Sequence, residues 1–165
     1  MATTYEKIAT TTLGSTSATI TLSSIPATYT DLRIVLVAKG TAYLEPYFYF
    51  NGDTASNYSK TQLYGEGTNA LSIRATSANN IFWHYYGTPG STNPGFYDIN
   101  VMSYAGSTFK TAIGTANEDD NGSGSVSAIV GLYRSTSAIT SITFGTNANS
   151  YAAGTIVTIY GILKA

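Results

Sequence analysis

The sequence predicts an all-β protein: an antiparallel β-sandwich of about ten short strands, in a single jelly-roll-like domain over residues 1–165. Apolar and polar residues alternate along much of the chain, which is the period of a half-buried strand. β-Branched and aromatic residues are frequent, and strong helix formers are sparse. Turn residues separate the alternating segments at short intervals, as in sandwiches and barrels. At 165 residues, one domain can bury a sufficient core without disulfides or metals.

Each expected strand is marked by alternation or by β-forming residues. Residues 18–22 and 97–101 show the alternation clearly. In chain order, the expected strands cover residues 4–11, 18–22, 32–38, 45–50, 58–64, 70–74, 80–86, 97–101, 108–115, 126–132, 138–144 and 156–163.

Turn residues separate these segments. Asn51-Gly52-Asp53 and Asn121-Gly122 tolerate positive φ at low cost, as tight hairpin turns require. Four prolines mark loops or sheet edges, because proline cannot donate to a β-ladder: Pro26, Pro46, Pro89 and Pro94.

The segment Leu32–Ala38 is apolar on both faces except at Arg33. One interpretation is a central strand with one face in the core and the other face under a loop. The alternative is a strand whose outer face contacts a neighbouring subunit.

Composition excludes several functional classes. Lys and Arg number 8 against 9 Asp and Glu, so the chain has no basic field for nucleic acid. We expect no membrane partner, because no apolar run approaches the length of a transmembrane helix. The first residues lack the apolar core of a secretory signal. With no Cys and a single His, His84, the chain lacks a thiol nucleophile and a site with two His ligands.

An aromatic run, Phe82-Trp83-His84-Tyr85-Tyr86, is one candidate binding surface. Alternation places Trp83 and Tyr85 on one strand face, where aromatic rings with polar neighbours can stack on sugars. If exposed, Trp83 is the first choice for a binding anchor. The alternative is that one face fills the core and the other face meets solvent or a subunit.

A second aromatic row lies at Tyr47-Phe48-Tyr49-Phe50. We expect Phe48 and Phe50 to point inward and Tyr47 and Tyr49 outward. Tyrosine suits an interface, because it offers a large area with few rotatable bonds and a polar tip. An ordinary strand with a half-covered outer row is the alternative.

The acidic stretch 117–122 partly matches the spacing of a calcium loop, through Asn117, Asp119 and Asn121 before Gly122. The twelfth position is Ala128, where a calcium loop has Glu, and no helix follows. A solvated hairpin tip is therefore preferred, and neither a metal nor another cofactor is expected.

No catalytic residues are expected. The acids are scattered rather than paired across a cleft, as glycoside hydrolysis needs. No Gly-x-Ser-x-Gly elbow accompanies His84. Gly122-Ser123-Gly124-Ser125 lacks the Lys and the helix of a phosphate-binding loop.

Several segments together carry a family resemblance that spans nearly the whole chain. They are Tyr5-Glu6-Lys7-Ile8-Ala9, residues 24–32, Phe50-Asn51-Gly52-Asp53, Ser56-Asn57-Tyr58-Ser59, Tyr64-Gly65, residues 104–108, residues 131–139 and Tyr160-Gly161-Ile162. In this combination the chain resembles small virion structural proteins of tailed bacteriophages, especially phages of aquatic hosts such as cyanobacteria.

The resemblance implies a jelly-roll module that decorates the capsid surface or forms part of a tail fibre. Because no separate anchoring domain precedes the strands, the expected function is a decoration, or cement, protein that binds the major capsid protein and stabilises the head. The resemblance also implies a homo-oligomer, expected to be a trimer, and supplies no catalytic residues. The alternative is a tail-fibre or spike module that binds host-surface glycan.

Overall fold

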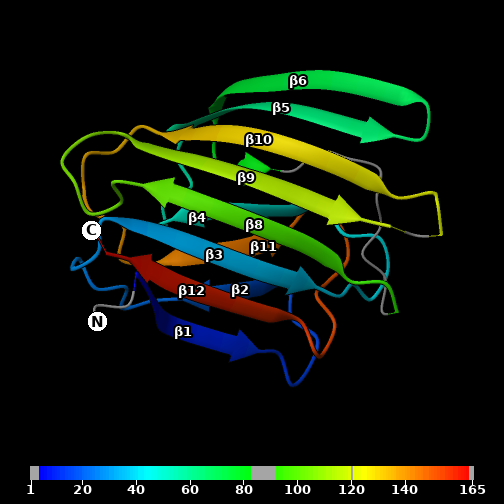
Figure 1. The fold of residues 1–165 in the computed structure, drawn as a ribbon, viewed down its shortest axis with the longest axis horizontal. Coiled ribbons are helices and arrows are strands. Elements are labelled where there is room, and N and C mark those ends of the chain that lie inside the picture. Colours follow the sequence, from blue (N-terminus) through cyan, green and yellow to red (C-terminus); the bar gives the residue numbers. More distant parts are fainter. Residues whose placement is uncertain (1–3, 83–91, 120, 164–165) are drawn as a thin grey trace.

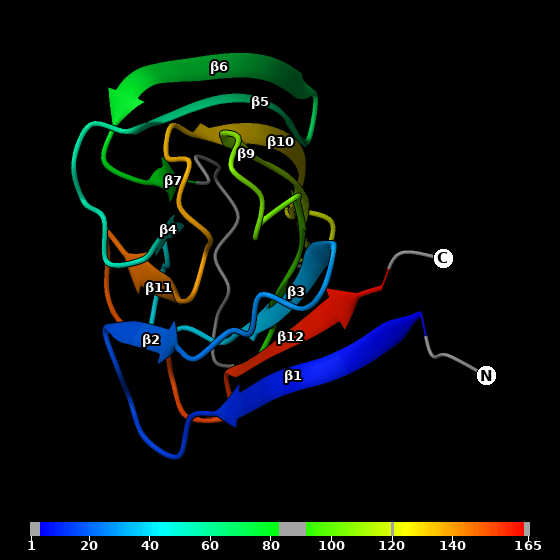
Figure 2. The same cartoon turned by 90° about the vertical axis from the view of Figure 1, so that its left-hand side faces the viewer.

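A computed structural model describes residues 4–82, 92–119 and 121–163. These residues form strands and connecting loops without a helix, in two antiparallel sheets that pack face to face (Figures 1 and 2). The predicted all-β sandwich is confirmed. None of the described residues belongs to a helix long and apolar enough to span a membrane.

The larger sheet has eight strands in the spatial order β1-β12-β3-β8-β9-β10-β5-β6. In chain order these strands are β1 (Tyr5–Thr12), β3 (Asp31–Ala38), β5 (Tyr58–Glu66), β6 (Asn69–Ala78), β8 (Gly95–Met102), β9 (Lys110–Glu118), β10 (Ser125–Tyr133) and β12 (Ile156–Ile162). The outer face of this sheet is turned toward the viewer in Figure 1.

The smaller sheet has four strands in the order β2-β11-β4-β7. They are β2 (Thr19–Leu22), β4 (Pro46–Phe50), β7 (Ile81–Phe82) and β11 (Ile142–Thr146). The described chain thus has twelve strands, and each overlaps one of the segments expected from the sequence. The expected strand at 138–144 begins only at Ile142, because Ile139 and Thr140 belong to a loop bonded to Tyr104 and Asn51. The segment expected at 80–86 extends beyond Phe82 into residues outside the described part.

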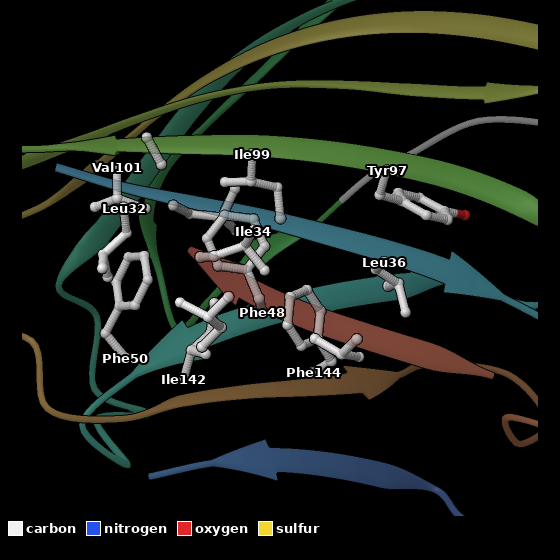
Figure 3. Packing of buried hydrophobic residues seen from close by; sticks show 14 of the residues in the cluster. Leu32, Ile34, Leu36, Phe48, Phe50, Tyr97, Ile99, Val101, Ile142 and Phe144 are labelled. Carbon is white, nitrogen blue, oxygen red and sulfur yellow. The ribbon is translucent and has the colours of Figure 1, made fainter. Parts of the chain in front are cut away.

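The core lies between the two sheets (Figure 3). Alternation along β3 sends Leu32, Ile34 and Leu36 inward, each fully buried. They face the smaller sheet, where Phe48 packs against Phe144 with ring centroids 6.0 Å apart. The two sheets therefore meet through side chains that occupy every second position of their strands.

The inner face of the larger sheet is polar beneath β5 and at the start of β9. Gln62 and Lys110 are fully buried, and Lys60 is 8% exposed. The Lys110 Nζ donates to the carbonyl of Gly106 at 2.6 Å, and the Lys60 Nζ donates to the carbonyl of Phe82. Buried ammonium groups need such acceptors, because an unpaired buried charge is costly.

Among the described residues, no loop covers the outer face of β3, in contrast to one of the two interpretations of Leu32–Ala38. Val35 and Val37 lie half-buried in the open sheet surface, and no described segment crosses in front of β3 in Figure 1. Beside them, Arg33 donates two hydrogen bonds to the Asp98 carboxylate, at 3.0 and 2.6 Å. This ion pair leaves the centre of the outer face without net charge.

Candidate binding surfaces

The first candidate surface is the outer face of the smaller sheet around Tyr47 and Tyr49, which we call the tyrosine face. β4 alternates between the two environments, as expected: Phe48 and Phe50 are fully buried, whereas Tyr47 and Tyr49 are half-buried on the opposite side. The alternation along β4 therefore places the two phenylalanine rings in the core and the two tyrosine rings on the surface.

The two tyrosine rings lie side by side in a nearly parallel, stacked arrangement. Their centroids are 6.3 Å apart and their planes differ by 23°. Tyr47 lies across Gly145 of β11, its register partner, and a Cβ atom at Gly145 would come 2.4 Å from the Tyr47 Cζ. Burial and the neighbouring Tyr49 phenol raise the pKa of Tyr47, so the ring remains neutral well above physiological pH.

Threonines continue the tyrosine face across the sheet. The Thr21 and Thr143 hydroxyls share a hydrogen bond of 3.0 Å, and Thr143 pairs in register with Tyr49. The surface thus combines aromatic area with neutral hydroxyl groups. Such a composition suits contact with a protein surface or a sugar rather than a charged ligand.

The other aromatic candidates, Trp83 and Tyr85, lie outside the described residues, and so does His84. The described part of this run ends at Phe82 of β7, which pairs in register with Tyr47. The structure therefore describes two of the four candidate binding residues.

The second candidate surface lies on the opposite side of the sandwich, and sequence reasoning did not identify it. We call it the apolar face, and it is the outer side of β5, β9 and β10. Its large exposed side chains are Leu63 (63% exposed), Val126 (58%), Ile113 (48%) and Val130 (45%). The alternation of Val126, Ala128 and Val130 is visible in the sequence, but it does not reveal which side of the strand faces the core.

The side of β10 that faces the core carries both small and large residues. Ser127 and Gly131 lie on it, together with Ile129 and Tyr133. A Cβ atom on Gly131 would come 2.5 Å from the Ile81 Cδ1, so the two sheets approach too closely there for a larger residue. Val126 and Val130 lie on the opposite side of β10 and point to solvent.

The apolar face contains a hollow of about 510 Å³. Leu63 and Val126 border it, and the small residues Ala128 and Gly65 contribute to its lining. Ala128 pairs in register with Leu63, so the most exposed leucine stands directly beside a small residue.

The acidic stretch begins in the last two residues of β9 and continues into the turn before β10, with Asp120 outside the described residues. The Asp119 Oδ1 accepts a hydrogen bond of 2.8 Å from the Gly122 backbone N–H. Asn121 and Gly122 have φ values of 53° and 91°, as the turn residues predicted. Across the described ranges, no three His, Asp or Glu side chains are grouped to hold a metal ion.

No protein-family model and no curated protein matches this chain.

Proposed function

We propose that this protein decorates the head of a tailed bacteriophage, where it binds the major capsid protein at the capsid surface and stabilises the shell. The observation that supports this proposal best is the pair of uncharged surfaces on opposite sides of one rigid sandwich. A decoration subunit must contact the shell and can also contact other copies of itself. Two opposite surfaces allow both contacts to form at once.

The tyrosine face is the proposed contact with the capsid protein. Tyr47 and Tyr49 lie on a paired strand and Tyr47 also packs on Gly145, so the two rings lose little conformational freedom on binding. Their register partners on β11, Gly145 and Thr143, carry no charge, so the contact should persist at high salt.

Closed symmetry would multiply the affinity of each weak contact on a capsid lattice. The family resemblance points to a trimer for this role. A trimer would place three tyrosine faces against the shell, so that release requires all three contacts to break together.

The location and copy number of the protein in an imaged virion test this proposal. We expect density on the head surface at a copy number in the hundreds, and a lower temperature of head disruption when the protein is removed. Labelled protein found only at the tail tip would contradict the proposal.

A binding experiment tests the proposed contact. The Tyr47→Ala and Tyr49→Ala variants should bind heads stripped of the protein at least about tenfold more weakly than wild type, as truncated interface anchors do. Tyr160→Ala, on the half-buried outer face of β12, is the matched control. Thermal denaturation of each variant verifies that it is folded. Equal binding by all three variants would exclude the tyrosine face.

The same ring pair favours the second candidate, a tail-fibre module that binds host glycan, since parallel aromatic rings stack on sugar faces. Binding of wild type to a host polysaccharide array, lost in Tyr47→Ala, would support this alternative. No binding to host polysaccharide would count against it.

A further inference from the structure

The apolar face carries four large apolar side chains that are strongly exposed to solvent. Leu63 and Val126 are both more than half exposed, and Ile113 and Val130 are nearly so. Isolated exposed apolar side chains are normal, but these four lie on three adjacent strands of one sheet. A contiguous apolar surface of this kind marks an interaction site.

Large and small residues alternate across this surface. Leu63 of β5 pairs in register with Ala128 of β10, and Val126 of β10 pairs with Gly65 of β5. Each protruding side chain therefore stands beside a position with little or no side chain, and the hollow of about 510 Å³ includes all four residues in its lining.

We infer that the occupant of the apolar face is a second copy of this chain, related by a two-fold axis that runs parallel to the strands between β5 and β10. Such an axis places each β5 over the β10 of the other copy. Leu63 then enters the space above Ala128 of the second copy, and Val126 lies over Gly65 of the second copy. A two-fold axis produces each contact twice, so one surface satisfies both partners.

The charges of the surface agree with self-association. The outward residues of β5, β9 and β10 are apolar or neutral, and the exposed Arg74 of β6, the register partner of Thr61, is a charged side chain beside them. The same axis places Arg74 over Ile113 of the second copy rather than over another Arg74. Two copies can thus approach without repulsion between like charges.

The area of overlap is close to the lower limit for a specific contact. The axis superposes four strands of each copy, β6, β5, β10 and β9, which are nine or ten residues long. At about 4.8 Å between strands and about 3.3 Å per residue, the overlap is about 570 Å² in projection. Stable interfaces start at about 600 Å² per partner, so we expect a dimer that forms at micromolar or higher concentration.

Exchange of the large and small residues tests the inference. The mass of each variant in solution is measured by light scattering at about 100 µM. Wild type should have the mass of two chains. If copies also form a three-fold contact through another surface, the mass should be that of six chains. Leu63→Ala removes the protruding side chain and Ala128→Leu fills the hollow, so each should weaken the dimer at least about tenfold. The double variant Leu63→Ala/Ala128→Leu exchanges the two roles and should dimerise again.

Mixing provides a sharper test. A Leu63→Ala chain and an Ala128→Leu chain complement each other at both contacts, since each contact then joins one leucine to one alanine. The two weakened variants should therefore form a heterodimer when mixed, which differently tagged chains reveal by co-purification. Ile156→Ala, an exposed apolar position on β12 outside the overlap, should leave the mass unchanged.

Three outcomes would overturn the inference: a monomeric wild type at this concentration, an oligomer that both single variants leave intact, or variants that do not associate when mixed. A mass of three chains that Leu63→Ala leaves unchanged would favour the trimer proposed above. The inference does not depend on the decoration function, since it concerns contacts between copies of the chain. A variant that no longer dimerises but still binds phage heads would show that the dimer contact and the decoration function are independent.

Discussion

The ring of Tyr47 lies across the backbone of Gly145 on the adjacent strand, where a Cβ atom would come 2.4 Å from the ring carbon Cζ. The tyrosine face is flat at this point because its central position carries no side chain. Glycine inside a strand weakens the sheet, and here the close approach of an aromatic ring accounts for it.

Replacing Gly145 with Ala should therefore displace Tyr47 and destabilise the fold by about 1–3 kcal/mol, the usual cost of overpacking. Urea denaturation measures the change, and binding to stripped heads should weaken in parallel. Gly14→Ala is the control, because no atom lies within 4 Å of a Cβ built there. Equal stability of the two variants would show that Tyr47 moves aside without cost.

Tyr58 anchors the turn that follows β4. It is fully buried and stacks on Tyr133 with ring centroids 4.7 Å apart. Its Oη accepts a hydrogen bond of 3.0 Å from the Phe50 N–H and donates one of 3.0 Å to the Asp53 carbonyl. Tyr58→Phe keeps the stacking but removes both bonds, so we expect a loss of about 1–3 kcal/mol in urea denaturation.

Tyr160→Phe is the matched control for Tyr58→Phe, because in the described part of the chain no side-chain hydrogen bond involves Tyr160. If both variants lose the same free energy of unfolding, the two bonds of Tyr58 do not stabilise the turn.

The Asn51 side chain connects this turn to the loop before β11. Its Oδ1 accepts from the Thr140 N–H at 2.8 Å, and its Nδ2 donates to the Ala138 carbonyl at 2.8 Å. Asn51→Ala should cost about 1–3 kcal/mol more than Asn121→Ala in thermal or urea denaturation. Asn121 has nearly the same positive φ, 53° against 54°, so the control separates lost hydrogen bonds from backbone strain. Equal losses would assign the whole effect to strain.

Burial lowers the pKa of Lys60 from the ordinary 10.5 to about 8. Between these pH values the unfolded chain holds a proton at this site that the folded chain has released. The free energy of unfolding should therefore increase as the pH rises from 8 toward 9.5. We limit this expectation to pH values below 9.5, because burial raises the pKa values of Tyr58 and Tyr104. Above about pH 10 these tyrosines lose their protons in the unfolded chain but keep them in the folded chain, which lowers the free energy of unfolding.

Lys60→Met should abolish most of this increase, whereas Lys7→Met on the exposed part of β1 should not. Urea denaturation at pH 7.5, 8.5 and 9.5 measures the dependence for each protein. A wild type with no increase, or a Lys60→Met variant with the same increase, would contradict the lowered pKa.

Much of the fold could be predicted because alternation is a local property of the chain. The inward Phe48 and Phe50 and the outward Tyr47 and Tyr49 follow from a period of two alone. The turn at Asn121-Gly122 follows from residues that accept positive φ. The strand expected at residues 138–144 begins four residues later than predicted, at Ile142. The reason is that Asn51, far away in the sequence, holds Thr140 in a loop.

The sequence by itself determined that the protein is all-β, where most of its strands lie and how the rings of β4 divide between core and surface. Only the tertiary structure decided which side of β10 meets the core, because Val126 and Val130 alternate as a buried face would but point to solvent. Only the tertiary structure buried Lys60 and Gln62. The physical reason is that alternation defines two faces of a strand, whereas the packing of a second sheet decides which face loses contact with water.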